Sequence, residues 1–409
     1  MKAVVWHGVG DIRVDEVPEP KIEKPTDAIV RLTSTAICGT DLHMIRGTFS
    51  GMKPGTILGH EGVGLIETLG PDVRNFNVGD RVLIPSTIAC GYCVYCRDGY
   101  YAQCDNANPN GPQAGAALFG GPQGAGGFQG LQAEKARVPF ANVNLIKLPN
   151  EIIDEQAILL SDIFPTGYFG ADMADIEPGK TVAIFGCGPV GQFAIASAKL
   201  MGAGRIFAVD NIPSRLDMAK NQGAEIINFD QEDPVEAIKR LTGGIGVDRA
   251  IDAVGVDANC AHSGPAARQA KQMQSAFQQQ VKELAPKQNP QNGNWIPGDA
   301  PIQASLWAVQ SLAKAGTLSI IGVYPQADMY FPIGEAMNKN LTIRMGICNH
   351  RKYIPLLVDL VQGGVIDPLT ILTETRPLQD AIEAYKAFDR REPGWVKVEL
   401  EAAFSGAGR

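Results

Sequence analysis

The distribution of apolar and polar residues divides the chain into a central region and two ends. From residue 158 onward, short apolar runs alternate with amphipathic segments, and this alternation of strand and helix predicts a doubly wound parallel sheet. The predicted strands are 181–185, 205–210, 247–254 and 316–323, and the predicted helices are 189–201 and 214–222.

The two ends of the chain are richer in β-type patterns. Short β-branched runs predict strands at 28–32, 63–67 and 81–84, with a turn at Gly79-Asp80. The tail from Leu341 also has a strand-like pattern and ends in an apolar run at 395–400. These patterns predict a β-rich region at either end of the chain.

A Gln-, Pro- and Asn-rich segment, 256–305, interrupts the central alternation. Its apolar spacing predicts a helix over 267–284, followed by a loop over 285–301. A second segment rich in Gly, Pro and Gln, 106–130, is typical of a loop. From the residues alone, an insertion that only extends over the surface, without a functional role, explains 256–305 equally well.

Charge and composition exclude several classes of partner. The chain has 409 residues, with 36 Lys and Arg against 44 Asp and Glu, a net charge of −8. This balance argues against nucleic-acid binding and against binding to an anionic membrane surface. Residues 1–6 lack a long apolar stretch, and the uncharged stretch 181–198 is broken by glycines. We therefore expect a cytoplasmic protein.

A glycine-rich turn lies between the first predicted central strand and its helix. The spacing G-x-G-x-x-G permits a tight turn, close approach of a pyrophosphate and close packing of strand and helix. Asp210 ends the next strand, where a carboxylate binds ribose hydroxyls and repels a 2′-phosphate, which favours NAD over NADP. A turn without a ligand is the alternative. The predicted cofactor-binding residues are Gly186, Gly188, Pro189, Val190, Gly191 and Asp210.

Four of the eight cysteines are clustered in the sequence. Their spacing, Cys90-x2-Cys93-x2-Cys96-x7-Cys104, suits a tetrahedral zinc site with no free coordination position, which is a structural site. An iron–sulfur cluster uses similar spacing, but its fourth cysteine usually precedes Pro, and Cys104 precedes Asp105. Disulfides or free thiols are the remaining alternatives.

A second group of metal-binding residue types is dispersed. Cys38 lies in Cys38-Gly39-Thr40-Asp41, and His60-Glu61 lies in a Gly-His-Glu-Gly segment. Spacing alone does not pair them, and a buried packing cysteine or a structural histidine explains each equally well.

Together these motifs resemble the zinc-dependent medium-chain alcohol dehydrogenase family. The similarity covers Cys-Gly-Thr-Asp at 38–41, Gly-His-Glu-Gly at 59–62, Val-Gly-Asp-Arg-Val at 78–82, the four-cysteine segment and the dinucleotide motif, in the family's order. Segments 138–149 and 161–168 are similar to the branch of glutathione-independent formaldehyde dehydrogenase and formaldehyde dismutase, which also has an insertion where this chain has 256–305, although the residues of the insertion are less similar.

The resemblance implies an α/β fold with two domains. A GroES-like β-rich catalytic domain would comprise 1–166 and 348–409, with a structural zinc lobe at 90–104. A Rossmann NAD-binding domain, with a doubly wound parallel sheet, would comprise 167–347 and carry the insertion 256–305.

The resemblance also implies roles for the dispersed residues. Cys38, His60 and Asp162 correspond to the catalytic zinc ligands, with Asp162 in place of the cysteine that most members use. An oxygen donor is harder than sulfur, so we expect a more Lewis-acidic zinc. Glu61 corresponds to a carboxylate that approaches the metal, with a solvated or salt-bridged Glu as the alternative.

A proton relay and further cofactor contacts follow from the same resemblance. Thr40 matches the hydroxyl beside the substrate oxygen and His43 the outer proton acceptor, with a plain surface His as the alternative to the latter. Asp41 would hold the ring of His60. Thr166 matches a nicotinamide contact. Two basic residues could reach cofactor phosphates or be solvated surface charges: Arg215 and Lys397.

The implied function is an NAD-dependent, zinc-dependent oxidoreductase that acts on an alcohol or a hydrated aldehyde, with formaldehyde among the candidates. Its cofactors would be two zinc ions per chain and NAD, and its partners a small substrate and further copies of itself in a dimer or tetramer. One alternative is an aldehyde dismutase that recycles a tightly bound NAD, and another is a non-catalytic NAD-binding structural protein.

Overall fold

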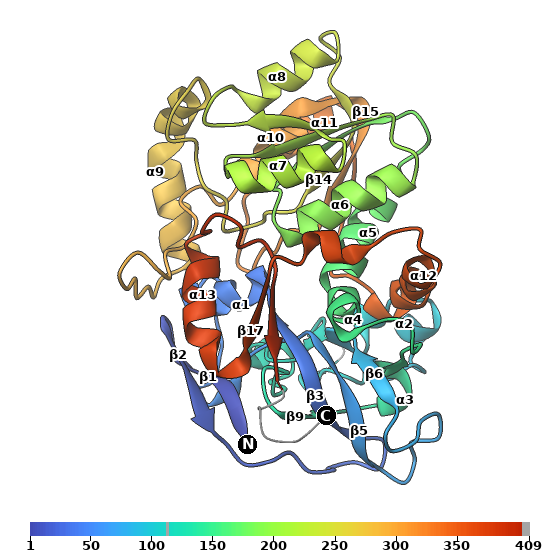
Figure 1. Ribbon diagram of the computed structural model, residues 1–409. Helices are drawn as coiled ribbons and strands as arrows, with labels where there is room; N and C mark the ends of the chain where they lie inside the picture. Colours follow the sequence, from blue (N-terminus) through green and yellow to red (C-terminus); the bar gives the residue numbers. More distant parts are fainter. Residues whose placement is uncertain (112–113, 403–409) are drawn as a thin grey trace. The chain divides into compact units, whose positions relative to one another are not determined.

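Two units make up the part of the chain that the computed structural model describes, residues 1–111 and 114–402 (Figure 1). The first unit comprises Met1–Pro165, Asn289–Trp295 and Cys348–Arg409, and the second comprises Thr166–Gln288 and Ile296–Ile347. The predicted catalytic domain ends at residue 409, and its last residues, 403–409, lie outside the described residues.

The second unit is built around the predicted parallel sheet. Its six strands have the order β13-β12-β11-β14-β15-β16, all parallel, which is the doubly wound arrangement. The fold class predicted from the alternating pattern is therefore confirmed. The strands are β11 (Thr181–Phe185), β12 (Arg205–Asp210), β13 (Glu225–Asn228), β14 (Val247–Asp252), β15 (Leu312–Ile320) and β16 (Thr342–Met345).

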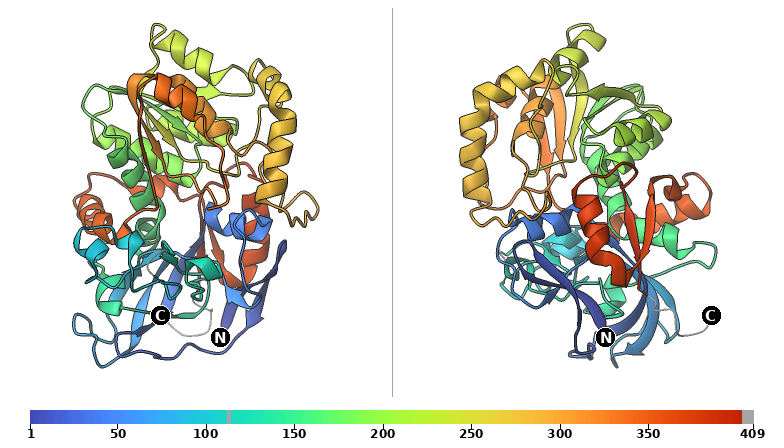
Figure 2. Two further views of the ribbon diagram at one scale, coloured as in Figure 1. Left: turned by 180° about the vertical axis from the view of Figure 1, so that it is seen from behind. Right: turned by 60° about the vertical axis from the view of Figure 1, so that its left-hand side comes forward.

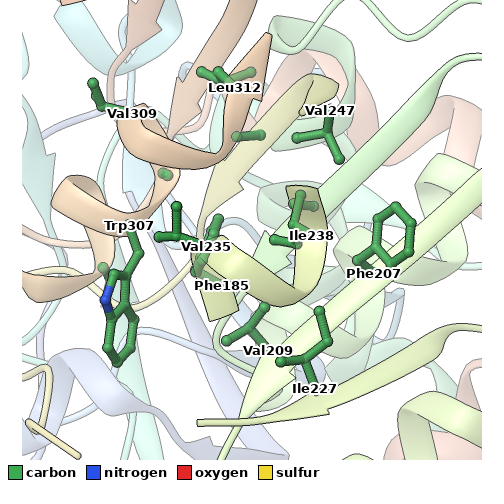
Figure 3. Close-up of a cluster of buried hydrophobic side chains, with 14 of the residues drawn as sticks. Phe185, Phe207, Val209, Ile227, Val235, Ile238, Val247, Trp307, Val309 and Leu312 are labelled. Carbon is green, nitrogen blue, oxygen red and sulfur yellow. The ribbon is translucent and has the colours of Figure 1, made fainter. Parts of the chain in front are cut away.

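Helices flank this sheet and supply its core. The helices of the unit are α6 (Pro189–Leu200), α7 (Pro213–Asn221), α8 (Pro234–Leu241), α9 (Ala266–Leu284), α10 (Gln303–Ser311) and α11 (Ile333–Asn338), together with α5 (Ile163–Met173) from Thr166 onward. Val235 and Ile238 of α8 and Trp307 of α10 pack with Phe185 and Val209 of the sheet (Figure 3). Burial of these apolar side chains is the main term that stabilises the layers.

The first unit is β-rich, as expected for both ends of the chain. One sheet has the order β10-β6-β5-β3-β18-β17, with β9 also paired to β3, and a smaller sheet has the order β2-β1-β4. β18 comes from the tail and pairs antiparallel with β3, so that Val398 lies opposite Ile37. The strands are β1 (Lys2–Gly8), β2 (Asp11–Glu16), β3 (Ala28–Ile37), β4 (Thr56–Ile57), β5 (Gly62–Leu69), β6 (Arg81–Ile84), β7 (Thr87–Ile88), β8 (Ala117–Leu118), β9 (Lys135–Val138), β10 (Ile146–Lys147), β17 (Glu374–Pro377) and β18 (Val398–Glu401).

The tail corrects one expectation. Its pattern predicted strands, but two helices occupy much of it because apolar residues recur at helical spacing there: Tyr353, Ile354, Leu357, Val358 and Val361 are all buried on one helix. The helices of the first unit are α1 (Gly39–Arg46), α2 (Val94–Arg97), α3 (Ala141–Asn144), α4 (Asp154–Ser161), α12 (His350–Gln362) and α13 (Ala381–Asp389).

Part of the insertion belongs to the first unit, whereas the resemblance placed all of 256–305 in the Rossmann domain. The side chains of Asn289 and Gln291 donate to the carbonyl oxygens of Val9 and Gly10, at 2.9 and 3.0 Å. Trp295 is 2% exposed and its backbone N–H donates to an Asp389 carboxylate oxygen at 2.7 Å. The polar loop is thus fixed by hydrogen bonds to residues far away in the sequence.

Among the residues that the structure describes, no helix is long and apolar enough to cross a membrane.

Candidate zinc and dinucleotide sites

Cys38 lies where strand β3 passes into helix α1. It is the N-cap of the helix, and its backbone N–H donates to the Asp41 carboxylate at 3.0 Å. A hydrogen bond from the N-cap backbone to a side chain of the first helical turn fixes the direction in which the chain enters a helix. The thiol is therefore held at the end of a sheet strand, and Thr40 and Asp41 follow on the first helical turn.

His60 follows Gly59, a position where the backbone conformation and a close neighbour both require glycine. Gly59 has a φ of +88°, and a Cβ on it would lie 2.4 Å from Cγ of Gln132, so no larger residue fits. His60 is 1% exposed. Its Nδ1 lies 3.3 Å from an Asp41 oxygen and its Nε2 lies 3.2 Å from Oδ2 of Asp162.

Asp162 sits at the junction of α4 and α5, which places its carboxylate beside the other two side chains. Oδ2 lies 3.6 Å from the Cys38 Sγ, and ligand atoms of Cys38, His60, Glu61 and Asp162 all lie within 4.8 Å of one another. In tetrahedral zinc sites, bonds of roughly 2.0–2.3 Å separate ligand atoms by about 3.3–3.8 Å. Thiolate, imidazole and carboxylate are zinc ligands, so the three side chains Cys38, His60 and Asp162 fit the predicted metal.

His350 contacts Asp162 from the other side, and sequence reasoning missed it. Its Nε2 lies 2.7 Å from Asp162 Oδ1, and its Nδ1 lies 3.1 Å from the Thr87 hydroxyl. Burial alone would raise the pKa of Asp162, but hydrogen bonds from His350 and His60 hold it well below its usual range. Asp162 is thus an ionised carboxylate with one oxygen engaged by His350 and the other directed at Cys38 and His60.

His350→Asn is expected to weaken zinc binding or turnover by about 10–100-fold, the usual cost of removing a residue that orients a metal ligand. The substitution removes the hydrogen bond that holds Asp162 but leaves Cys38 and His60 in place. Zinc affinity from chelator competition, together with kcat, measures the effect. Thr87→Val, which removes only the far partner of the His350 ring, is the control with a smaller loss. Unchanged affinity and kcat in His350→Asn would contradict the assignment.

Lys397 corrects a second expectation, because it is neither solvated nor available to a cofactor phosphate. It is fully buried, and its Nζ lies 2.5 and 2.7 Å from the two oxygens of Glu61 and 3.1 Å from the carbonyl of Ile37. Burial alone would lower the pKa of Lys397, but the Glu61 carboxylate raises it above its ordinary value. Glu61 is therefore salt-bridged, as the alternative interpretation had it. Its carboxylate nevertheless lies with the ligand atoms of Cys38, His60 and Asp162.

The side chains predicted to form the proton relay lie on or next to α1. The Thr40 hydroxyl is 3.9 Å from the Cys38 Sγ. His43 is buried, which excludes the plain surface His, and its Nδ1 lies 3.2 Å from the Thr48 hydroxyl. Thr48 was not singled out from the sequence, where a Thr after Arg46-Gly47 carries no signal. Hydroxyl and imidazole groups in this order are chemically suited to move a proton.

The four clustered cysteines converge as their spacing predicts. Their sulfur atoms lie within 4.8 Å of one another, and none of the eight cysteines, all in the described part of the chain, forms a disulfide. The Cys90 sulfur accepts hydrogen bonds from the backbone N–H groups of Tyr92 and Cys93 and from the Asn106 side chain. Four cysteine sulfurs that converge in this way fit a structural zinc.

In the second unit, the glycine-rich turn and Asp210 come together. A Cβ on Gly191 would lie 1.9 Å from the carbonyl oxygen of Gly186, so the close strand–helix contact requires glycine. The Asp210 carboxylate accepts from the backbone N–H of Cys187 at 2.7 Å. Arg215, on α7, has a guanidinium nitrogen 3.7 Å from where a Gly188 Cβ would be. Helix α6 begins at Pro189, and Val190 follows on its first turn, so its N-terminus, the carboxylate and the cation fit a dinucleotide.

Thr166 is placed by the same helix junction as Asp162. It lies on α5, which begins directly after Asp162, one helical turn further along. The role of Thr166 as a contact of the nicotinamide stays a prediction.

The chain matches two family models and is similar to several known proteins. The family model of the alcohol dehydrogenase GroES-like domain matches residues 24–150, and that of the zinc-binding dehydrogenase matches 189–269. A zinc-type alcohol dehydrogenase-like protein of Bacillus subtilis (strain 168) is 38% identical over 405 residues, 98% of this chain and 100% of the relative. The glutathione-independent formaldehyde dehydrogenase of Pseudomonas aeruginosa (strain LESB58) is 36% identical over 419 residues, 99% of each chain. The solved alcohol dehydrogenase of Thermus sp. ATN1 is 34% identical, covers 98% of this chain and 100% of its own, and has a TM-score of 0.80.

The chain belongs to the zinc-dependent medium-chain alcohol dehydrogenase family. Within the family it falls in the branch that includes glutathione-independent formaldehyde dehydrogenase. It is a zinc-dependent oxidoreductase that acts on alcohols, rather than the non-catalytic structural protein of the last alternative.

Proposed function

We propose that Cys38, His60 and Asp162 hold the catalytic zinc and that the four clustered cysteines hold a structural zinc. The observation that carries the first assignment is the convergence of a thiol, an imidazole and a carboxylate from three separate segments, with ligand atoms within 4.8 Å. Zinc bound there supplies a Lewis acid at the substrate oxygen, and NAD supplies the hydride acceptor.

The protein's own residues position the substrate and remove its proton. The Thr40 hydroxyl accepts a hydrogen bond from the substrate hydroxyl and takes up its proton as it passes its own toward His43. Thr40 and His43 are three residues apart on α1, a spacing that places two side chains on one face of a helix. Thr48 holds the His43 ring and Asp41 holds the ring of His60. Glu61, which is ion-paired with Lys397, places a second carboxylate beside the metal ligands.

Thr40→Val is expected to lower kcat by about 10²–10⁴-fold, the usual contribution of a positioned proton-transfer group. Valine has nearly the same shape but cannot relay a proton. Thr40→Ser keeps the hydroxyl and is expected to retain most of the activity. Steady-state kinetics, with zinc content measured alongside, tests this, and undiminished alcohol oxidation by Thr40→Val would exclude the relay.

The substrate that we propose is a small alcohol or a hydrated aldehyde, with formaldehyde as the first candidate. The support is the 36% identity to a formaldehyde dehydrogenase over nearly the whole of both chains. The hydrate of formaldehyde has two hydroxyl groups on its carbon, so transfer of hydride from that carbon to NAD and loss of one hydroxyl proton give formic acid.

A dismutase is the second candidate, favoured by the insertion. Its segment Asn289–Trp295 belongs to the first unit, although the chain on either side of it belongs to the second. Such additional anchoring of the insertion would slow the release of a cofactor. The retained NADH would then reduce a second aldehyde to the alcohol, which regenerates NAD without exchange.

One experiment distinguishes these candidates. The purified protein is given formaldehyde without added cofactor, and products are quantified by NMR. Methanol and formate in equal amounts would show that bound NAD is recycled, as the dismutase candidate requires. No turnover until NAD is added, followed by accumulation of NADH, would identify a dehydrogenase with an exchangeable cofactor. Absence of turnover with formaldehyde in both conditions, together with oxidation of another alcohol, would exclude formaldehyde as the substrate.

We also propose a cytoplasmic location and a homo-oligomer, either a dimer or a tetramer. Support for the location comes from the eight cysteines, none of which forms a disulfide in the described part of the chain, as in a reducing compartment. Sedimentation of the zinc- and NAD-loaded protein would establish the number of copies.

A further inference from the structure

A second group of one cysteine, one histidine and one aspartate lies in the second unit. Ligand atoms of Cys260, His262 and Asp299 all lie within 4.8 Å of one another. The three residues belong to the insertion and take no part in the zinc and dinucleotide sites described above. Cys260 and His262 precede helix α9, the gold helix of Figure 2, and Asp299 follows the loop after it.

Short hydrogen bonds hold the thiol and the carboxylate together. The backbone N–H of Cys260 donates to Asp299 Oδ1 at 2.7 Å, and the Cys260 Sγ lies 3.2 Å from Asp299 Oδ2. One carboxylate oxygen is therefore engaged by the backbone, and the other faces the sulfur. Asp162 is arranged in the same way, with one oxygen engaged by His350 and the other near the Cys38 sulfur.

The backbone around these residues is also held in place. The segments on either side are joined where Ala300 N–H donates to the carbonyl of Ala258 at 3.0 Å and Gly298 N–H donates to Asp257 at 3.0 Å. The backbone N–H of His262 donates to Oδ1 of Asp230 at 2.8 Å. The three ligand-bearing positions are thus preorganised, which lowers the entropic cost of metal binding.

The charges around the group favour a cation. Two carboxylates lie at the group, because Asp299 accepts from the backbone N–H of Cys260 and Asp230 accepts from the backbone N–H of His262, and the His262 side chain is exposed to solvent. Sulfur, imidazole nitrogen and carboxylate oxygen together suit zinc better than calcium or magnesium, which prefer oxygen alone.

We propose that Cys260, His262 and Asp299 bind a zinc ion that fastens the base of the insertion. Cys260 and Asp299 are 39 residues apart, and the segment between them contains α9 and the Asn289–Trp295 segment. A metal that joins its two ends closes this excursion into a loop and reduces the conformational freedom that it has when unfolded. Because two of the ligands are exposed, the ion exchanges with solvent more readily than the zinc of the buried groups.

The test measures zinc content and thiol reactivity, and neither depends on catalysis. The enzyme is loaded with zinc, passed through a desalting column and analysed for metal. Cys260→Ser, His262→Asn and Asp299→Asn are each expected to carry one zinc per chain fewer than the unsubstituted enzyme. Asp217→Asn, which removes an exposed carboxylate of the same unit, is the control that keeps the full content. His262→Asn alters an exposed side chain, so it tests the site even if Cys260→Ser folds poorly.

Alkylation of Cys260 locates the ion. Peptide mapping after iodoacetamide treatment is expected to show that zinc slows the modification of Cys260 at least tenfold and that His262→Asn abolishes this protection. Equal zinc content in the unsubstituted enzyme and all three variants, with Cys260 alkylated at the same rate with and without zinc, would overturn the proposal. Alcohol oxidation is expected to persist in the variants, which separates this ion from the catalytic zinc.

Discussion

Asp162→Asn is expected to lower kcat/KM by about 10³-fold, because a catalytic metal contributes several kcal/mol of charge stabilisation and each 1.36 kcal/mol changes the rate tenfold. The substitution keeps the shape of the side chain but replaces an anionic ligand by a neutral amide. We therefore expect the variant to carry one zinc per chain fewer than the unsubstituted enzyme. Kinetics and metal analysis on the same preparation measure both effects.

Two further variants make this test specific. Glu155→Gln removes an exposed carboxylate on α4, the helix that ends at Asp162, and is expected to leave activity and zinc content unchanged. Asp162→Cys restores an anion, so we expect zinc to be retained, with lower turnover because sulfur is a softer donor than oxygen. Full turnover by Asp162→Asn with its zinc in place would show that Asp162 is not a ligand.

Lys397→Met is expected to destabilise the protein by about 3–5 kcal/mol, the typical cost of leaving one partner of a buried ion pair without the other. Lys397 and Glu61 are both fully buried, so the remaining carboxylate has no access to water. The double substitution Glu61→Gln/Lys397→Met removes both charges and should recover much of the loss. Urea unfolding of zinc-loaded protein, followed by tryptophan fluorescence, measures the differences in midpoint.

A surface ion pair of the same unit supplies the matched control. Lys386 lies 2.7 Å from Glu383 on α13, and both side chains are substantially exposed. Exposed pairs contribute at most about 1 kcal/mol, so Lys386→Met should hardly change the midpoint. If Lys397→Met were no more destabilising than Lys386→Met, the buried pair would not carry the stability that we assign to it.

How well each site could be predicted depended on the sequence distance between its members. Cys90 and Cys104 are 14 residues apart, and the glycines of the dinucleotide turn are closer still, so their spacing constrains their geometry. Cys38, His60 and Asp162 come from three segments, with Asp162 124 residues after Cys38. No spacing rule links them, and only the resemblance to a family brought them together before the structure did.

Two of the residues that sequence reasoning missed or misjudged act through distant partners. His350 is 188 residues from Asp162, and Lys397 is 336 residues from Glu61. A histidine at the start of a helix and a lysine in a short apolar run have no pattern that reveals a buried partner. Their roles exist only because the tail returns to the first unit, where β18 pairs with β3.

The sequence by itself therefore determined the class of fold, the dinucleotide turn and the four-cysteine group, because local periodicity and short spacings encode local geometry. The tertiary structure decided which side of Asp162 is held by His350, that Lys397 is buried against Glu61, and that Asn289–Trp295 belongs to the first unit. These outcomes depend on the packing of segments far apart in the chain. Desolvation and hydrogen bonding between such segments arise only when the whole chain has folded.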